Sequence, residues 1–304
     1  MSLRNKTIAE ALREGKQRLR SAGKDAYAVE AELLLEKAVG LNRTALFLRG
    51  EEPLSAEAAM QYEGFLAERE SGRPTQYILG TWEFMGLPFS VGEGVLIPRG
   101  DTEILVETIL EKQQTEPLRT ILDIGTGSGC IPVSLSHYGQ FEYVLAVDIS
   151  RKALGYATKN AAANHAEISF YESDLFQNIP AQWRGQLDAI VSNPPYIPKE
   201  DIAGLMTEVK DFEPRNALDG GADGLDFYRA IAAESREWLK QGGWLFFEIG
   251  YEQPCARFWQ TLAIRKSASD RTWQDWTGLP LGDIQERRRG HKNVRPFGGN
   301  RNEI

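Results

Sequence analysis

The chain has 304 residues, of which 42% are hydrophobic and 26% are charged, so it has room for one large domain or two smaller ones. Its net charge of −8 argues against a protein that mainly binds phosphate backbones, since such binding uses clustered Lys and Arg. No apolar run approaches the roughly 18 residues of a membrane span, and the N-terminus lacks the apolar core of a signal peptide. We therefore expect a cytoplasmic protein with no membrane association. Two cysteines and three scattered histidines predict neither a disulfide framework nor a metal site.

Residues 1–75 have the periodicity of a small helical bundle. Thr7 and Glu10 are spaced as a capping box at a helix start, Gly40 ends a second helix, and Ser55 can cap a further one. Nothing in this region indicates catalysis. It could serve equally as a docking platform or as a stabilising appendage, because a fold alone does not specify a function.

The pattern changes twice after the predicted bundle. Residues 76–98 contain short aromatic and β-branched runs separated by glycines, which predicts a β-hairpin linker. Over residues 99–280 short apolar runs alternate with helical patterns, the order typical of a mostly parallel, doubly wound α/β sheet, and Asp101 can cap the first helix. Residues 281–304 are polar and carry six Lys or Arg against three Asp or Glu, which predicts a solvated tail.

A glycine-rich turn follows the strand predicted at residues 120–124. The turn consists of Gly125, Thr126, Gly127, Ser128 and Gly129. Alternate glycines let the backbone approach a ligand closely, but their spacing differs from the G-x-G-x-x-G of dinucleotide-binding proteins. Asp123, at the strand end, would face a cation better than a pyrophosphate. A ligand with a positive amino-acid end and no phosphates, such as S-adenosylmethionine, therefore suits this turn.

Acidic side chains also end the next two predicted strands. Asp148 follows the second strand, where folds of this kind hydrogen-bond a ribose diol. Asp174 follows the third strand and can accept an adenine amino hydrogen. Leu175 or Phe176 would then cover the adenine ring. A turn cap is an equally good interpretation of Asp174.

The fourth predicted strand, residues 187–191, leads to Asn193, Pro194, Pro195 and Tyr196. Two prolines hold Asn193 extended and leave carbonyl oxygens with few N–H donors nearby. The Asn193 side-chain oxygen and the Pro194 carbonyl could each accept one hydrogen of a planar –NH2 group, with the Tyr196 ring against its plane. A turn that merely ends the strand is the alternative. The glycine turn, both acids and Asn193 would all lie at the carboxyl ends of successive strands, where open α/β sheets bind ligands.

Together these segments resemble the bacterial release-factor glutamine methyltransferases, from near the N-terminus to about Gln253. The residues that carry the resemblance are Leu96-Ile97-Pro98-Arg99-x-Asp101-Thr102-Glu103, Asp123-Ile124-Gly125-Thr126-Gly127-Ser128-Gly129, Asn193-Pro194-Pro195-Tyr196 and Phe212-Glu213-Pro214-Arg215-x-Ala217-Leu218. The Asn-Pro-Pro-Tyr sequence also occurs in adenine-N6 DNA methyltransferases. A chain that combines Asn-Pro-Pro-Tyr with an N-terminal helical bundle resembles the release-factor enzymes.

The resemblance implies a Rossmann-like class I methyltransferase domain that uses S-adenosylmethionine. Its substrate would be the glutamine of the Gly-Gly-Gln motif of peptide-chain release factors, methylated on the side-chain amide nitrogen. In that family the glycine turn and the residues matching Asp148, Leu175 and Asn193 contact the cofactor, and the residues matching Asn193–Tyr196 hold the glutamine. The helical bundle helps to dock the release factor. Two features depart from the family. An aromatic residue can occupy the position of Leu175 in the family, and the family usually ends in two strands rich in Val and Ile, whereas residues 281–304 of this chain are polar.

We expect Asn193, Pro194 and Tyr196 to be the catalytic residues. An adenine-N6 nucleic-acid methyltransferase could use them on a flipped base, and a ribosomal protein could replace the release factor as the substrate. A NAD-type oxidoreductase would need the missing glycine spacing, and a binding module without activity would not need the sequence from Asn193 to Tyr196. Glu248, in the strand predicted at residues 244–249, has either a functional or a structural interpretation. We expect a monomer that does not contact nucleic acid directly.

Overall fold

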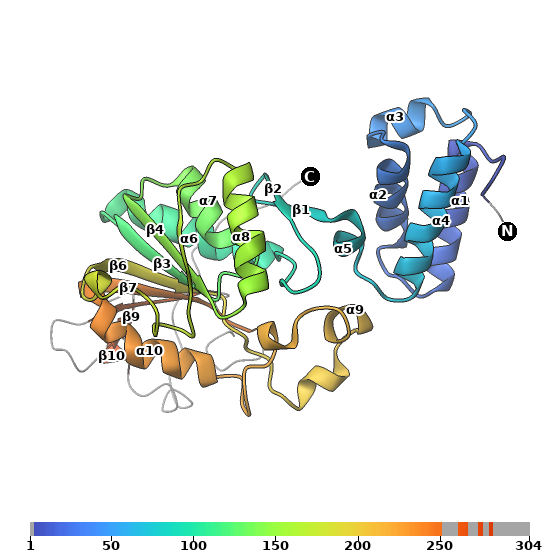
Figure 1. Ribbon diagram of the computed structural model, residues 1–304. Helices are drawn as coiled ribbons and strands as arrows, with labels where there is room; N and C mark the ends of the chain where they lie inside the picture. Colours follow the sequence, from blue (N-terminus) through green and yellow to red (C-terminus); the bar gives the residue numbers. More distant parts are fainter. Residues whose placement is uncertain (1–2, 251–260, 267–272, 276–279, 282–304) are drawn as a thin grey trace, which may run out of the picture. The chain divides into compact units, whose positions relative to one another are not determined.

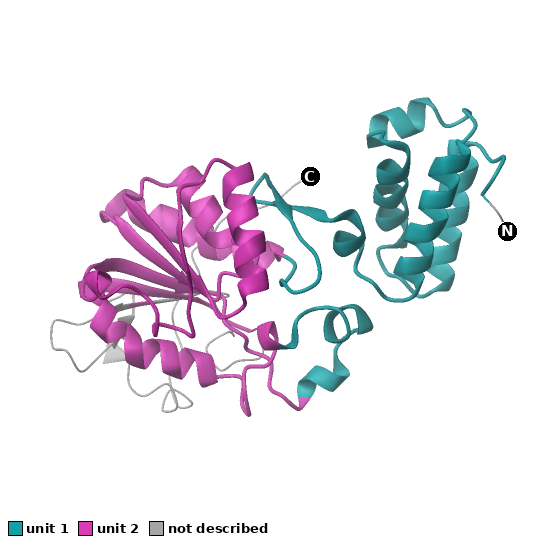
Figure 2. Cartoon of the chain, in the orientation of Figure 1, with its two compact units in different colours: residues 1–97, 201–215 teal, residues 98–200, 216–304 magenta. Residues whose placement is uncertain are grey.

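The computed structural model describes residues 3–250, 261–266, 273–275 and 280–281, so nearly all of the predicted tail at 281–304 lies outside the described residues. The chain divides into two compact units, shown in different colours in Figure 2. The first unit comprises Met1–Ile97 and Asp201–Arg215, and the second comprises Pro98–Glu200 and Asn216–Ile304.

The first unit is a helical bundle followed by a hairpin. Its elements are α1 (Ile8–Ser21), α2 (Tyr27–Val39), α3 (Arg43–Leu48), α4 (Ala56–Glu70), α5 (Thr75–Leu79), β1 (Thr81–Phe84) and β2 (Leu87–Ser90). The predicted capping box is present, since the Thr7 hydroxyl accepts from the Glu10 amide at 3.2 Å and the Glu10 carboxylate accepts from the Thr7 amide at 3.0 Å. Leu34, Leu35 and Tyr62 are fully buried between the helices. The apolar faces of α2 and α4 therefore form the core of this unit.

A buried arginine joins a distant segment to the bundle within the first unit. Residues 201–215 contain η2 (Asp201–Gly204) and α9 (Thr207–Lys210), and η3 (Arg215–Ala217) follows. The Arg69 side chain is 4% exposed and donates from Nε to Glu30 at 3.0 Å and from Nη2 to Glu208 at 2.6 Å. Because a buried guanidinium without its carboxylates would be strongly destabilising, Arg69 fixes where α9 packs.

Replacement of Arg69 by methionine should destabilise the first unit. We expect Arg69→Met to lower the free energy of unfolding by about 3 kcal/mol, the lower end for a buried pair because Glu208 is partly exposed. Urea unfolding measures the change. Arg49→Met, which removes an exposed pair with Glu52, is the matched control and should leave the unfolding midpoint unchanged. Equal effects of the two substitutions would contradict the role given to Arg69.

The second unit contains a mostly parallel sheet, which confirms the predicted fold class. Parallel strands lie in the order β7-β6-β3-β4-β5, and β8, β9 and β10 extend the sheet antiparallel beyond β7. The strands are β3 (Thr120–Ile124), β4 (Tyr143–Asp148), β5 (Ser169–Glu172), β6 (Leu187–Ser192), β7 (Leu239–Glu248), β8 (Thr261–Lys266), β9 (Trp273–Asp275) and β10 (Pro280–Leu281). The strand order reverses between β3 and β6, and such a switch point opens a crevice at the carboxyl ends of the strands.

Helices cover both faces of this sheet (Figure 1). They are α6 (Gly100–Thr115), α7 (Cys130–Tyr138) and α8 (Arg151–Ala163) on one face and α10 (Asp226–Trp238) on the other, with η1 (Ala181–Trp183) in a connection. The core under α10 contains Leu122 of β3, Val147 of β4, Ile190 of β6 and Phe247 of β7, all at most 2% exposed. Among the residues that the structure describes, none of the helices combines the length and the apolar character that a membrane span requires.

Two local predictions were wrong. Asp101 does not cap α6, because the helix begins at Gly100 and its N-cap is Arg99. Asp101 lies instead in the first turn, where a carboxylate still interacts favourably with the helix dipole. Strand β7 begins at Leu239, earlier than the apolar run from Trp244 indicates, because its polar start pairs with β6 across a register shift.

Candidate functional site

The predicted site residues of the second unit follow the carboxyl ends of β3, β4, β5 and β6. Parallel registers pair Ile124 of β3 with Val147 of β4, and Asp148 with Glu172 of β5. At the other side of the switch point, the Ser192 hydroxyl at the end of β6 donates to the Ile124 carbonyl at 2.7 Å. The sheet therefore brings the glycine turn, Asp148 and the residues after Ser192 to one edge.

The glycine turn folds back over the end of β4. The amides of Gly125 and Thr126 donate to the Val147 carbonyl at 2.9 and 3.0 Å. Gly125 and Gly127 have φ of +73° and +55°, and a Cβ added at either would meet nothing within 4 Å among the described residues. Backbone in this conformation with open space around it favours close approach of a ligand.

Gly129 has a different role, because it allows the turn to pack against α8. Its φ is +81°, and a Cβ there would lie 3.0 Å from both Cα and Cβ of Ala157. Asn160 of α8, 1% exposed, donates to the Ser128 carbonyl at 2.8 Å. Sequence reasoning missed Asn160; a polar residue on the buried face of a helical pattern was the available signal.

Asp123 is a buried carboxyl group at the end of β3. It is 1% exposed, and neither oxygen has a hydrogen-bond partner within the part of the chain that the structure describes. Burial raises the pKa of Asp123 to about 7; the Thr126 hydroxyl acts in the opposite direction, and Asp148 adds to the rise. The Thr126 hydroxyl is likewise buried without a hydrogen bond of good geometry to any described residue. Buried polar atoms left in this state cost free energy and indicate a place for a ligand.

Asp148 is held by two backbone donors. Its Oδ2 accepts from the Gly127 amide at 2.9 Å and its Oδ1 from the Ser150 amide at 2.8 Å. Burial raises the pKa of Asp148, while these two hydrogen bonds lower it. The next residue, Ile149, is 60% exposed. A fixed carboxylate beside an exposed apolar side chain suits a ligand that has both hydroxyl groups and a flat apolar part.

Asp174 and Leu175 lie in the turn after β5. Asp174 is exposed, its carbonyl accepts from the Gln177 amide at 3.1 Å, and its carboxylate accepts from the Gln177 side chain at 3.2 Å. Leu175 is half-buried with φ of +48°, which is unusual for a residue with a side chain. The Ser173 hydroxyl donates to the Leu175 carbonyl at 2.9 Å and stabilises this turn. Contact of either residue with an adenine ring stays a prediction.

Residues 193–196 follow β6, and neighbouring segments of backbone pack closely against Tyr196. Pro194 is buried, and Asn193, Pro195 and Tyr196 are half-buried. A Cβ on Gly224 would lie 2.3 Å from the Tyr196 carbonyl oxygen, and one on Gly250 would lie 2.8 Å from the Tyr196 ring. These close approaches fix the backbone and the ring of Tyr196.

Two further residues surround Asn193. Its Nδ2 donates to the Thr102 hydroxyl of α6 at 3.2 Å. Glu248, at the end of β7, is 4% exposed, and burial raises the pKa of Glu248 to about 7 although hydrogen bonding from Thr102 and Asn193 lowers it. Sequence reasoning left Glu248 undecided and gave Thr102 no separate role.

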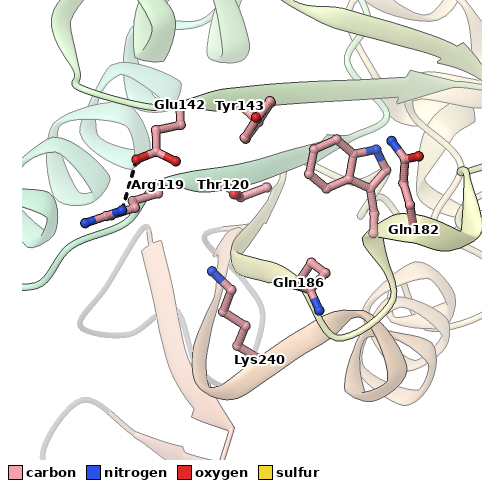
Figure 3. Close-up of a pocket in the computed structure, with 8 residues that line it drawn as sticks. Arg119, Thr120, Glu142, Tyr143, Gln182, Gln186 and Lys240 are labelled. Atoms are coloured by element: carbon pink, nitrogen blue, oxygen red, sulfur yellow. Dashed lines mark hydrogen bonds and ion pairs between the residues drawn. The ribbon is translucent and has the colours of Figure 1, made fainter.

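A cavity of about 520 Å³ lies elsewhere, at the opposite edge of the sheet (Figure 3). Thr120 and Tyr143, the first residues of β3 and β4, line it together with Trp183 and Lys240. An ion pair of 3.1 Å joins Arg119 and Glu142 at its margin. Because it lies at the amino ends of the strands, this cavity does not belong to the candidate site.

The sheet, the glycine turn and the buried acids define a Rossmann-like methyltransferase. Residues 10–80 match the PrmC N-terminal domain family and residues 99–209 match the Methyltransferase small domain family. The release factor glutamine methyltransferase of Geobacter sulfurreducens is 43% identical over 247 residues, which cover 81% of this chain and 85% of that protein. The enzyme of the same name from Moorella thermoacetica is 44% identical over 250 residues, 81% of this chain and 87% of that one. The chain belongs to the release factor glutamine methyltransferase family, as the sequence resemblance indicated.

A solved structure is also similar, at a lower level. The 16S rRNA N2 G1207 methyltransferase of T. Thermophilus is 20% identical, with a TM-score of 0.43, over 60% of this chain and 48% of that one.

Substitution of Gly129 tests how the glycine turn packs. Gly129→Ala should lower the free energy of unfolding by about 1–3 kcal/mol from backbone strain alone, and the contact with Ala157 should add to it. Gly155→Ala is the control. Gly155 lies on α8, the helix that carries Ala157, and a Cβ there meets no described atom within 4 Å. The control substitution should raise the free energy of unfolding by about 0.5–1 kcal/mol. Urea unfolding compares the two, and a Gly129→Ala protein as stable as the wild type would contradict this packing.

Proposed function

We propose that this protein transfers the methyl group of S-adenosylmethionine to the side-chain amide nitrogen of a glutamine, the one in the Gly-Gly-Gln motif of a peptide-chain release factor. The observation that carries the proposal is the sequence Asn193–Tyr196 at the carboxyl end of β6, in a chain of this family. It acts as a cytoplasmic monomer, without contact to nucleic acid or membrane.

The residues at the strand ends fit S-adenosylmethionine. Asp123 would hold its ammonium group, because the carboxyl oxygens are buried and lack a described hydrogen-bond partner. Asp148 would accept from the ribose hydroxyls. The glycine turn, residues 125–129, would line the methionine part, with its open backbone at Gly125 and Gly127. Ile149 and Leu175 would cover the adenine, and Asp174 would accept from its amino group.

Asn193 and Pro194 would orient the substrate nitrogen. When bound, the cofactor supplies an electrophilic methyl group. An amide nitrogen is a poor nucleophile because its lone pair is delocalised into the carbonyl. Acceptance of its two hydrogens by the Asn193 Oδ1 and the Pro194 carbonyl would localise that lone pair and direct it, while Tyr196 would pack on the amide plane. Orientation of this kind supplies roughly 7–11 kcal/mol in favourable systems, so no strong base is required, and the proton leaves late.

The helical bundle of the first unit would dock the release factor. Its helix α3 carries two adjacent apolar side chains in water, Phe47 at 87% exposed and Leu48 at 76%. Exposed apolar side chains that lie together are typical of a surface that binds another protein. The net charge of −8 favours a protein over a nucleic acid as the partner.

Cofactor binding should depend on the ionisation of Asp123. The pKa of Asp123 is about 7, and an ammonium group pairs only with the carboxylate, so affinity is full above pH 7 and falls as the pH drops below it. We expect a loss of roughly tenfold per pH unit below 7, measured by isothermal titration calorimetry. Asp123→Asn should bind weakly at every pH. Asp148→Asn should bind less tightly but keep the pH dependence, and loss of that dependence there would assign it to Asp148 instead.

Asn193→Ala should lower methyl transfer by roughly a hundredfold to a thousandfold, because one oriented acceptor is lost in the reacting geometry. Cofactor affinity should be retained in part. The assay incubates methyl-labelled S-adenosylmethionine with a purified release factor or with duplex DNA, and a release factor whose motif glutamine is alanine is the substrate control. Label in DNA alone would favour the adenine-N6 alternative, and normal turnover by Asn193→Ala would contradict the proposed role of Asn193.

A further inference from the structure

Glu248 and Thr102 approach Asn193 from two different elements. Strands β6 and β7 are parallel and pair Ser192 with Phe247, so the next residues, Asn193 and Glu248, follow side by side. On β7, Leu245 and Phe247 pack in the core with Tyr228 of α10. Side chains alternate along a strand, so Glu248 points to the other face of the sheet, which is the α6 face.

A contact farther along β7 supports this orientation. Trp244 Nε1 donates to Glu116, the residue after α6, at 2.9 Å, and Lys112 Nζ of α6 lies 4.2 Å from the Trp244 ring centre. Trp244 and Glu248 are four residues apart and therefore share a face. Thr102, in the first turn of α6 and 2% exposed, lies on this side of the sheet.

The three side chains form one polar cluster. Asn193 Nδ2 donates to the Thr102 hydroxyl at 3.2 Å, and Thr102 and Asn193 both act by hydrogen bonding to lower the pKa of the neighbouring Glu248 carboxyl. The Glu248 Oε2 atom is buried without a hydrogen-bond partner in the described ranges. A buried carboxylate with an unpartnered oxygen costs free energy. The packing of β7 does not by itself require a carboxylate at this position.

The chemistry of the cluster selects one orientation of the Asn193 amide. A carboxylate has only acceptors, and a hydroxyl that donates its single hydrogen to that carboxylate can only accept from Asn193. Both neighbours therefore require the NH2 group of Asn193 and not its oxygen. The Oδ1 atom is then directed away from Thr102 and Glu248.

We propose that Thr102 and Glu248 are positioning residues, which hold the Asn193 amide so that Oδ1 faces the amide of the substrate glutamine. This inference rests on the proposed function, since it assigns Oδ1 its partner. Neither residue touches the substrate. They act by preventing the rotation that would present Nδ2, a donor, to a group that has hydrogens to donate.

The orientation then depends on the charge of Glu248. A protonated carboxyl group can donate to Oδ1, which favours the opposite orientation of the amide. Besides Thr102 and Asn193, the groups that face this carboxyl are Asp101, which raises its pKa, and Arg99, which lowers it. From α7 the buried Cys130 thiol, whose pKa burial raises to about 12, stays uncharged, and from α10 the Tyr228 hydroxyl donates to the Glu248 carbonyl at 2.8 Å.

Turnover at saturating cofactor and release factor is the first test. In the wild type we expect kcat to rise as Glu248 ionises, through about pH 7, and to level off above it. Glu248→Gln cannot ionise, so its kcat should be independent of pH over this range and roughly tenfold lower at high pH, because glutamine does not select one orientation. Thr102→Val should lower kcat roughly tenfold to a hundredfold with cofactor affinity unchanged, and Thr102→Ser should restore it. A wild-type pH profile in Glu248→Gln, or an unchanged kcat in Thr102→Val, would overturn the proposal.

A second measurement does not need the reaction. In protein labelled with ¹⁵N at asparagine, the Asn193 Nδ2 resonance is identified by its absence from Asn193→Ala. It should titrate with the pKa of Glu248 in the wild type and stay constant in Glu248→Gln. Titration without methylation of a release factor would refute the proposed function and leave the positioning intact, whereas methylation without titration would refute the positioning alone.

Discussion

The pairing of β3 with β4 on one side and with β6 on the other is the constraint on which the site depends. Because β3 is parallel to both neighbours and the strand order reverses there, the carboxyl ends of all three meet at one edge. The Ser192 hydroxyl bonds the ends of β3 and β6 together at 2.7 Å. A register shift of one residue would turn Asp123 or the residues before Asn193 to the wrong face of the sheet.

Two buried carboxyl groups with pKa near 7 lie at different strand ends of the candidate site. Neither Asp123 oxygen has a hydrogen-bond partner among the described residues, which suits a cationic ligand. Glu248 already interacts with Thr102 and Asn193, which suits a group that orients its neighbours. In the proposed function the same physical cause, burial, would serve ligand binding at Asp123 and alignment of a side chain at Glu248. Both raise the free energy of the folded state locally, as functional sites commonly do.

The sequence predicted the fold because the pattern of short apolar runs and helical segments is local. The glycine spacing and the two prolines after Asn193 are also local, and they gave the candidate site residues. Contacts between distant elements were not predictable: Arg69 reaches Glu208, and Thr102 reaches Asn193, through packing that no single segment encodes. The start of β7 was missed because its polar residues lack the apolar pattern of a buried strand. The solvated tail predicted at residues 281–304 lies outside the described residues, apart from Leu281 at its start, and stays a prediction.

We propose that Asn193 and Pro194 direct a glutamine amide nitrogen at the cofactor. Tandem mass spectrometry of a release factor incubated with the protein and S-adenosylmethionine tests it most directly, because fragment ions locate the added methyl group on a single side chain. We expect one methyl group on the side-chain amide of the Gly-Gly-Gln glutamine. An unmodified glutamine, with the methyl group on another residue or in another macromolecule, would contradict it.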